Sequence, residues 1–269
     1  MITSVHNPRI KHLVRLRERR YREREGRILI EGAAEVELAL DSGVPLQTLF
    51  LCASLATSAS APLLLDRLRQ SGVEVVVVAP NVFTKIAYRE NPDGWLAVAP
   101  FPRRRLADLD MTLATLSPPP LLLVAETIEK PGNLGAMLRT ADAAGITAFI
   151  LCDPHTDLSN PNVVRSSRGA LFSVPLAEAS SHETLAWLKQ HNIALLAATP
   201  QATIPYTHTD LRGPVAIAVG EEKHGLSPLW LEQADLQVRI PMRGRVNSLN
   251  VATAAALLIY EALRQRQTV

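Results

Sequence analysis

The chain has 269 residues, of which 47% are hydrophobic and 20% charged, and its formal net charge is +2 at pH 7. This length predicts two globular domains, each able to bury a core of its own. No apolar run reaches the roughly 18 to 20 residues of a membrane span, and the charged N-terminus lacks the apolar core of a secretory signal, so we expect a cytoplasmic protein. Cys52 and Cys152 form no C-x-x-C motif and predict packed, reduced thiols.

The first distinctive segment is basic. Residues 9–27 contain nine arginine and lysine residues against three glutamates. Such a segment can neutralise RNA phosphates and release their counterions, which makes Arg9 and Lys11 candidate RNA contacts. The alternative is a solvated helix whose arginines pair with the neighbouring glutamates.

Strands and helices alternate through the next 70 residues or so. Strands are predicted at 28–30, 47–52, 73–78 and 95–99, helices at 33–40 and 62–70, and a turn-rich loop at 88–94. This alternation predicts a small α/β domain at residues 1–100. Residues 101–120 end in Ser117-Pro-Pro-Pro120, which must be extended, and are predicted to be a linker rich in proline and arginine.

The pattern beyond residue 120 predicts a second α/β domain at 121–269. Strands are predicted at 121–126, 147–151, 193–198, 215–219 and 236–240, and helices at 132–145, 180–191, 226–233 and 248–264, with a loop and a short helix at 157–169. Alternation of this kind indicates a mostly parallel sheet.

Three loops in this domain follow predicted strands and lead into predicted helices. They are Glu129–Ala141, Gly220–Ser227 and Ile240–Val251. Open α/β sheets bind their ligands at the carboxyl ends of strands, so these loops are the candidate site. The last helix is expected to begin at Ser248, with Ser248 or Asn250 as its cap.

The order and spacing of residues in these loops resemble the three motifs of the SPOUT superfamily, specifically the TrmH (SpoU) branch of RNA ribose 2′-O-methyltransferases. The match covers roughly residues 120 to 264. Its motifs here are Asn133-x-Gly-x-x-x-Arg139, Gly220-x-Glu222-x-x-Gly225-Leu-Ser and Ile240-Pro-Met…Ser248-Leu-Asn250. The resemblance implies S-adenosylmethionine as cofactor, a deep trefoil knot in the C-terminal part, a homodimer, and an L30e-like substrate-binding domain at residues 1–100.

The resemblance makes Arg139 the catalytic arginine. A guanidinium is effectively always protonated, so phosphate anchoring and electrostatic activation are favoured over proton abstraction, and a plain surface arginine is the alternative. Asn133 is expected to cap its helix and to orient Arg139, and Glu222 to orient a neighbour or to face the dipole of the next helix. Ser248 and Asn250 are expected to position the reacting groups.

The sequence contains neither G-x-G-x-x-G after a strand nor a Walker lysine loop, which argues against dinucleotide and P-loop nucleotide sites. Carrying the family pattern over places Thr199, Gly220, Ile240 and Leu249 on the cofactor. Gly220 lacks a Cβ and so permits a close approach of backbone to ligand, whereas Ile240 and Leu249 fit a packed core equally well.

Two further features point to partners. Arg165 and Arg168 lie beside hydroxyl groups and are candidate RNA contacts, with helix capping as the alternative role of that segment. The last helix is apolar around most of its circumference, which suits a homodimer interface. The histidines form no H-x-x-x-H pair, so no metal site is predicted.

The main prediction is therefore S-adenosylmethionine-dependent methylation of a ribose 2′-hydroxyl. The extra N-terminal domain favours ribosomal RNA over transfer RNA. The alternatives are a transfer-RNA ribose methyltransferase, a base-methylating SPOUT enzyme, and a non-catalytic RNA-binding factor in ribosome assembly.

Overall fold

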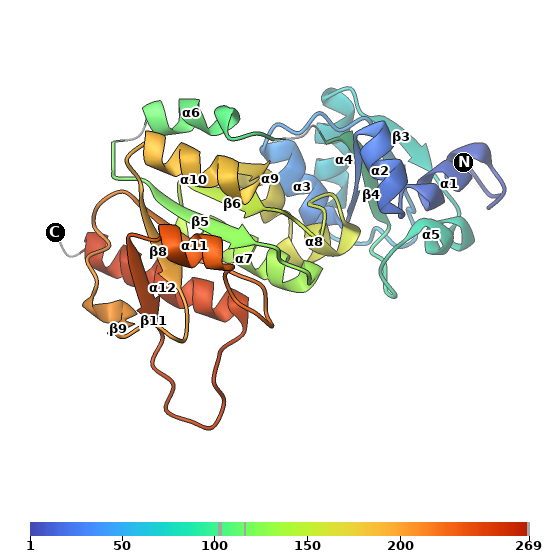
Figure 1. The fold of residues 1–269 in the computed structure, drawn as a ribbon. Coiled ribbons are helices and arrows are strands. Elements are labelled where there is room, and N and C mark those ends of the chain that lie inside the picture. The colour runs from blue at the N-terminus through green and yellow to red at the C-terminus, as the bar shows by residue number, and fades with distance from the viewer. Residues whose placement is uncertain (102–103, 116, 268–269) are drawn as a thin grey trace. The chain divides into compact units, whose positions relative to one another are not determined.

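The computed structural model describes residues 1–101, 104–115 and 117–267 (Figure 1). These residues form two compact units. The first unit comprises the described part of Met1–Pro102 together with Asp157–Ser173, and the second comprises the described part of Arg103–Thr156 together with Val174–Val269. The predicted domain boundaries differ from these units, because they assign residues 157–173 to the C-terminal domain.

The first unit contains a four-stranded sheet with the order β1-β4-β2-β3. Strand β4 is antiparallel to both β1 and β2, and β2 is parallel to β3. Its strands are β1 (Arg27–Glu31), β2 (Thr48–Leu51), β3 (Glu74–Val77) and β4 (Trp95–Pro100). Its helices are α1 (Pro8–Arg15), α2 (Arg19–Glu25), α3 (Ala33–Asp41), α4 (Ala61–Gln70), α5 (Pro80–Ile86), α8 (Pro161–Ser167) and α9 (Ala170–Ser173).

The basic N-terminal segment forms the two helices α1 and α2. Asn7 caps α1 by accepting the N–H of Arg9 at 2.9 Å, and Ile10 and Leu13 bury one face of the helix. Most arginines of the segment pair with acidic groups, as in the pairs Arg9–Glu74, Arg19–Glu23, Arg20–Glu18, Arg22–Asp157 and Arg24–Glu25. The ion-paired helix considered as the alternative therefore describes most of this segment.

The second unit contains a seven-stranded sheet with the order β7-β6-β5-β10-β8-β11-β9. Every neighbouring pair in it is parallel, which confirms the predicted mostly parallel sheet. Its strands are β5 (Leu121–Glu126), β6 (Ala148–Cys152), β7 (Leu176–Ala179), β8 (Ala194–Ala198), β9 (Ile204–Pro205), β10 (Val215–Val219) and β11 (Leu236–Arg239).

Helices cover both faces of this sheet (Figure 1). Helices α7 (Pro131–Ala144) and α12 (Val251–Gln267) pack on each other and on β5, β6 and β10. Helices α6 (Ala107–Ala114), α10 (Ser181–Gln190) and α11 (Pro228–Gln233) cover the opposite face, where Trp187 and Trp230 join the core. None of the described helices is long and apolar enough to cross a membrane.

The predicted linker at residues 101–120 contains helix α6, whose Leu109 is buried against the second unit's sheet. Residues 102, 103 and 116 of that linker lie outside the described residues. The segment that the sequence marks as a connection is therefore, over α6, part of the folded second unit.

Candidate functional site

The three motif loops meet at one edge of the second unit's sheet. Strands β5, β10, β8 and β11 are consecutive neighbours and run parallel, so their carboxyl ends lie at the same edge. The loop after β11 projects away from the sheet before the chain enters α12 (Figure 1). Residues 243–250 of this loop are exposed.

A chain of hydrogen bonds connects all three motif loops. The side-chain amide of Asn133 on α7 donates to Glu222 Oε1, and the amide of Asn250 donates to Asn133 Oδ1 at 3.0 Å. The second carboxylate oxygen, Glu222 Oε2, is buried and has no hydrogen-bond partner among the described residues. Loops separated by about 90 and 30 residues in sequence are thus held in one arrangement, with one acceptor left over.

Asn250 also determines where the last helix begins. Its Oδ1 accepts the backbone N–H of Ala252 at 3.0 Å, and α12 starts at Val251. The prediction that this helix begins at Ser248 is therefore wrong. Ser248 lies in the exposed loop before α12, so it is not the cap of that helix.

The prediction that Asn133 caps its helix is wrong. Helix α7 is preceded by Lys130 at the N-cap position, without a side-chain cap, and has Pro131 as its first residue. The amide of Asn133 is instead used between Glu222 and Asn250.

The second motif loop is closed by its own backbone. Gly225, with φ of 72°, donates its N–H to the carbonyl of Glu221 at 2.9 Å. A Cβ on Gly220 would lie 2.2 Å from the carbonyl carbon and oxygen of Gly225. The lack of a side chain at Gly220 is thus required for a close approach within the loop itself.

Sequence reasoning missed the carboxylate that supports this loop. Glu126, at the end of β5, is buried and accepts the backbone N–H of Ser227 at 2.8 Å, directly before α11. The helix-start role considered as the alternative for Glu222 therefore belongs to Glu126, whereas Glu222 accepts from the neighbouring amide of Asn133. An acidic residue closing the apolar run 121–126 was the available signal.

Arg139 lies on α7, with its side chain exposed. Its guanidinium has no hydrogen bond or ion pair within the described part of the chain. A long cation without an internal partner, on the helix that carries Asn133, is available to a bound anion.

The candidate cofactor residues follow neighbouring strands. Thr199 comes after β8, is buried, and donates its backbone N–H to Val238 of β11 at 2.9 Å, next to the strand end that leads to Ile240. Gly220 follows the adjacent strand β10 and is buried, and Ile240 is half-buried. Leu249 is exposed beside the cap Asn250, so of these apolar side chains it is the one that does not fit a packed core.

The thiol of Cys152 is not a candidate nucleophile for the site. Cys152 ends β6, and burial raises the pKa of its thiol to about 12. The thiol therefore stays protonated near neutral pH and is not a nucleophile. In the described ranges, no group of three or more His, Cys, Asp or Glu side chains could hold a metal ion.

The candidate RNA contacts lie in the first unit. Arg9 is engaged with Glu74, at 2.8 Å between Arg9 Nη1 and Glu74 Oε1, and this bond raises the pKa of Arg9. Lys11, Arg165 and Arg168 are exposed. Within the described chain, none of these three side chains has a hydrogen bond or ion pair.

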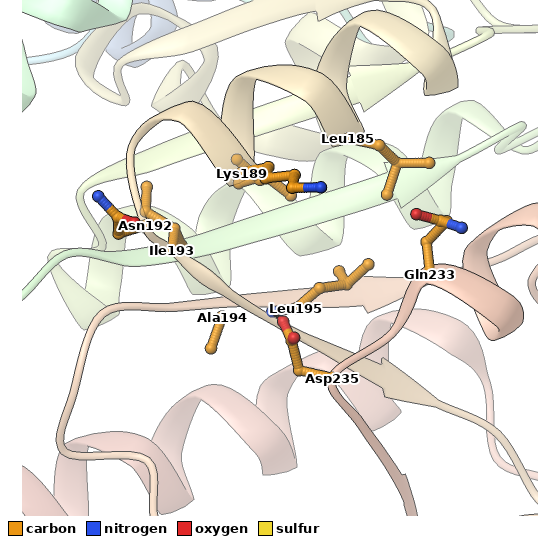
Figure 2. Close-up of a pocket in the computed structure, with 9 residues that line it drawn as sticks. Leu185, Lys189, Asn192, Ile193, Ala194, Leu195, Gln233 and Asp235 are labelled. Atoms are coloured by element: carbon orange, nitrogen blue, oxygen red, sulfur yellow. Dashed lines mark hydrogen bonds between the residues drawn. The ribbon is translucent and has the colours of Figure 1, made fainter.

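A cavity of about 460 Å³ lies elsewhere in the second unit. Figure 2 shows Leu185 and Lys189 of α10 on one side of it and Gln233 and Asp235 on the other. Ala194 opens β8 and Asp235 precedes β11, so this cavity lies at the amino ends of the strands. Since ligands of open α/β sheets bind at the carboxyl ends, we place the candidate site at the motif loops and not in this cavity.

Comparison with known families agrees with both parts of the chain. The SpoU rRNA Methylase family matches residues 120–260, and the MRM3-like substrate binding domain matches residues 7–97. The chain is 30% identical to the 23S rRNA (guanosine(2553)-2′-O)-methyltransferase RlmP of Bacillus subtilis, over 96% of this chain and 97% of that protein.

Solved structures give the same result. A crystal structure of an RNA 2′-O ribose methyltransferase has a TM-score of 0.85 and 46% sequence identity, covering 99% of each chain. The SpoU methyltransferase AviRb from Streptomyces viridochromogenes, in complex with the cofactor AdoMet, has a TM-score of 0.86 and 30% identity, covering 98% of this chain and 100% of that one. The resemblance inferred from the three motifs is confirmed, and the chain belongs to the SpoU rRNA methylase family.

Proposed function

We propose that this protein transfers a methyl group from S-adenosylmethionine to a ribose 2′-hydroxyl of ribosomal RNA. The observation that carries the proposal is the hydrogen-bonded chain Asn250–Asn133–Glu222, which joins the three motif loops beside a helix bearing the unpaired Arg139. Relatives of nearly the same length are named 23S rRNA 2′-O-methyltransferases, and a similar structure contains AdoMet. A non-catalytic binding factor would not need these polar groups held in one arrangement.

The reaction needs an acceptor oxygen held in line with the donor and relieved of its proton. When bound, S-adenosylmethionine would supply an electrophilic methyl group on a sulfonium: the S–CH3 bond breaks as the O–CH3 bond forms, S-adenosylhomocysteine leaves, and the hydroxyl proton passes to solvent water. We assign to Arg139 the anchoring of an RNA phosphate and the electrostatic stabilisation of the developing alkoxide, since a guanidinium does not act as a base. Asn133, Glu222 and Asn250 fix the loops, and we assign to Ser248, on the exposed loop, the positioning of the ribose.

The chain's own residues fit the cofactor at this edge. Glu222 Oε2 is a buried acceptor without a partner, which suits a hydroxyl or amine donor of a bound ligand. Leu249 is an exposed apolar side chain next to the polar chain, which suits the face of a purine. Thr199, Gly220 and Ile240 supply backbone groups at the ends of three adjacent strands.

Four finer features belong to the same proposal. We assign the second unit a trefoil knot. We assign the first unit, in which residues 1–100 have an L30e-like fold, RNA binding through Lys11, Arg165 and Arg168, with Arg9 contributing once it is released from Glu74. Leu257 and Tyr260 are exposed on α12 and support a homodimer through that helix. Methylation of ribosomal RNA supports a cytoplasmic location.

The test is incubation with labelled S-adenosylmethionine and ribosomal RNA lacking the modification, followed by mapping of the labelled nucleotide. We expect label on one 2′-O-methylated ribose, with transfer reduced about 100-fold or more in Arg139→Ala, as for other lost electrostatic contacts to a transition state. Arg212→Ala removes another exposed arginine of the second unit and is expected to keep wild-type activity. Label on a base, or equal activity of wild type and Arg139→Ala, would contradict the proposal.

A further inference from the structure

An exposed tyrosine stands out in the first unit, on the loop that precedes β4. The Tyr88 side chain is 41% exposed, and it is neither part of the unit's core nor part of any motif discussed above. The guanidinium of Arg17 lies over its ring, 5.8 Å from the ring centroid, and the amide of Asn162 on α8 donates to its hydroxyl at 3.3 Å. An aromatic ring bordered by a cation and an amide has the composition of a nucleotide-binding surface.

Buried carboxylates hold the backbone of this tyrosine in place. Glu31 accepts the backbone N–H of Tyr88 at 2.6 Å and that of Arg89 at 3.2 Å. Burial raises the pKa of Glu31, and the two N–H donors partly offset that effect. Arg89 donates to Glu35 at 2.6 Å, and Asp93 accepts the N–H of Ala33 at 2.8 Å, so the loop is tied to the sheet and α3 at both ends.

The buried guanidinium of Arg22 holds the two segments that carry Arg17 and Asn162, the residues in contact with the Tyr88 side chain. Arg22, only 2% exposed, donates to the carbonyls of Leu16 and Arg17 at 3.1 and 2.6 Å, and to Asp157 at 2.9 and 3.1 Å. It thereby joins the turn that carries Arg17 to the segment that carries Asn162. An exposed surface whose three components are fixed by buried charged groups is preorganised, which lowers the entropy cost of binding.

Helix α8 extends this surface with positive charge. Arg165 lies one turn beyond Asn162, is exposed, and its guanidinium is unpaired within the described chain. Residues three apart lie on the same side of a helix, so Arg165 and Asn162 face the same way. A phosphate beside a base stacked on Tyr88 would thus find a cation within one helical turn.

We propose that Tyr88, Asn162 and Arg165 bind an unpaired nucleotide of the RNA substrate, with the base stacked on Tyr88, its edge or sugar bonded by Asn162, and a neighbouring phosphate bound by Arg165. This inference rests on the proposed function, because it takes RNA to be the substrate. It adds that the substrate carries a bulged or looped-out nucleotide at a second position, read by the first unit. A continuous duplex would bury its bases and leave the ring without a partner.

The test uses the full chain and two RNA hairpins, one fully paired and one with a single bulged 2-aminopurine. Wild type is expected to bind the bulged hairpin about 10-fold more tightly, the size of one base-aromatic stack, and to change the 2-aminopurine fluorescence. Tyr88→Phe keeps the ring and the preference, whereas Tyr88→Leu loses both the preference and the fluorescence change. Arg165→Ala weakens binding of both hairpins equally and lowers the salt slope by about 1.

Two controls separate this surface from general effects. Arg69→Ala removes an exposed arginine of the same unit, on α4, and is expected to leave both affinities unchanged. Asn162→Ala provides a second route, with a partial loss of preference, if Tyr88→Leu lowers the thermal stability. Equal binding of both hairpins by wild type, or a Tyr88→Leu variant with the wild-type preference, overturns the inference.

Methyl transfer distinguishes this failure from failure of the proposed function. If wild type methylates ribosomal RNA but Tyr88→Leu has an unchanged KM, the function stands and the nucleotide surface is rejected. If wild type transfers no methyl group but shows a Tyr88-dependent preference for the bulge, the surface stands and the proposed activity is rejected.

Discussion

Single side chains at the site serve two neighbours at once, and Asn250 is the clearest case. Its carbonyl oxygen accepts the first N–H groups of α12, while its amide nitrogen donates to Asn133. Capping is a property that serine shares, but serine is too short to reach Asn133 and cannot supply the amide. The two roles can therefore be separated by substitution.

We expect Asn250→Ser to keep stability within about 0.5 kcal/mol of wild type, and Asn250→Ala to lose about 1 kcal/mol with the cap. Both variants are expected to lose about tenfold in methyl transfer, because one positioning hydrogen bond of about 1.5 kcal/mol is removed from the chain to Glu222. Denaturant unfolding and initial rates with labelled cofactor measure the two effects. An active Asn250→Ser enzyme would show that the bond to Asn133 has no catalytic importance.

At the scale of elements, the loop from Gly220 to Ser227 shows how close backbone packing positions a side chain of the site. It must turn tightly enough to bring Glu222 to Asn133, and the turn relies on the backbone of Gly225 passing close to Gly220. Glu126 supports its far end through Ser227. The geometry of this loop therefore determines the position of the Glu222 carboxylate.

Gly220→Ala tests this coupling. The new Cβ would lie 2.2 Å from backbone atoms of Gly225, so the loop must shift, and we expect destabilisation of about 1 to 3 kcal/mol. A displacement of Glu222 by about 1 Å would lower methyl transfer up to about 100-fold. Gly213→Ala is the matched control, since a Cβ there meets nothing within 4 Å. Wild-type activity in Gly220→Ala, by rate assay at equal folded fraction, would refute the coupling.

The sequence predicted most of the second unit's elements because their patterns are strong. The run 121–126 became β5 with unchanged bounds, and helix 132–145 was displaced by one residue at each end, to 131–144. Strand β7, Leu176–Ala179, was not predicted, because Leu-Ala-Glu-Ala has little β-propensity and is held by pairing with β6. The contacts of Asn133 were also beyond prediction, since they join residues 89 and 117 positions apart.

At the scale of the whole molecule, the chain alternates between its two units. It leaves the second unit after Thr156, contributes residues 157–173 to the first, and returns at Val174. In this segment, helix α8 contacts β1 and helix α9 contacts α3. No periodicity in the sequence marks such a change of unit, which is why the predicted domain boundary at residue 121 did not include it.

The buried pair Arg22–Asp157 is expected to hold the segment 157–173 in the first unit. Arg22 is 2% exposed and also bonds Ser159, so replacing it with methionine leaves the Asp157 carboxylate buried without its partner. Loss of one member of a buried pair costs about 3 to 5 kcal/mol. We therefore expect Arg22→Met to lower the unfolding free energy by that amount and to increase hydrogen exchange in residues 157–173.

The exposed pair Arg20–Glu18 in the same segment provides the control, with side chains 72% and 54% exposed. Arg20→Met removes the same charge, and we expect a change below about 1 kcal/mol, because exposed ion pairs contribute little. Because residues 157–173 connect the two parts of the second unit, their release in Arg22→Met leaves a free 17-residue loop in that unit but breaks none of its strands. Protection of β5 and β10 should then be retained while α8 exchanges. Simultaneous loss of protection in α8, β5 and β10 would show instead that the two units unfold as one.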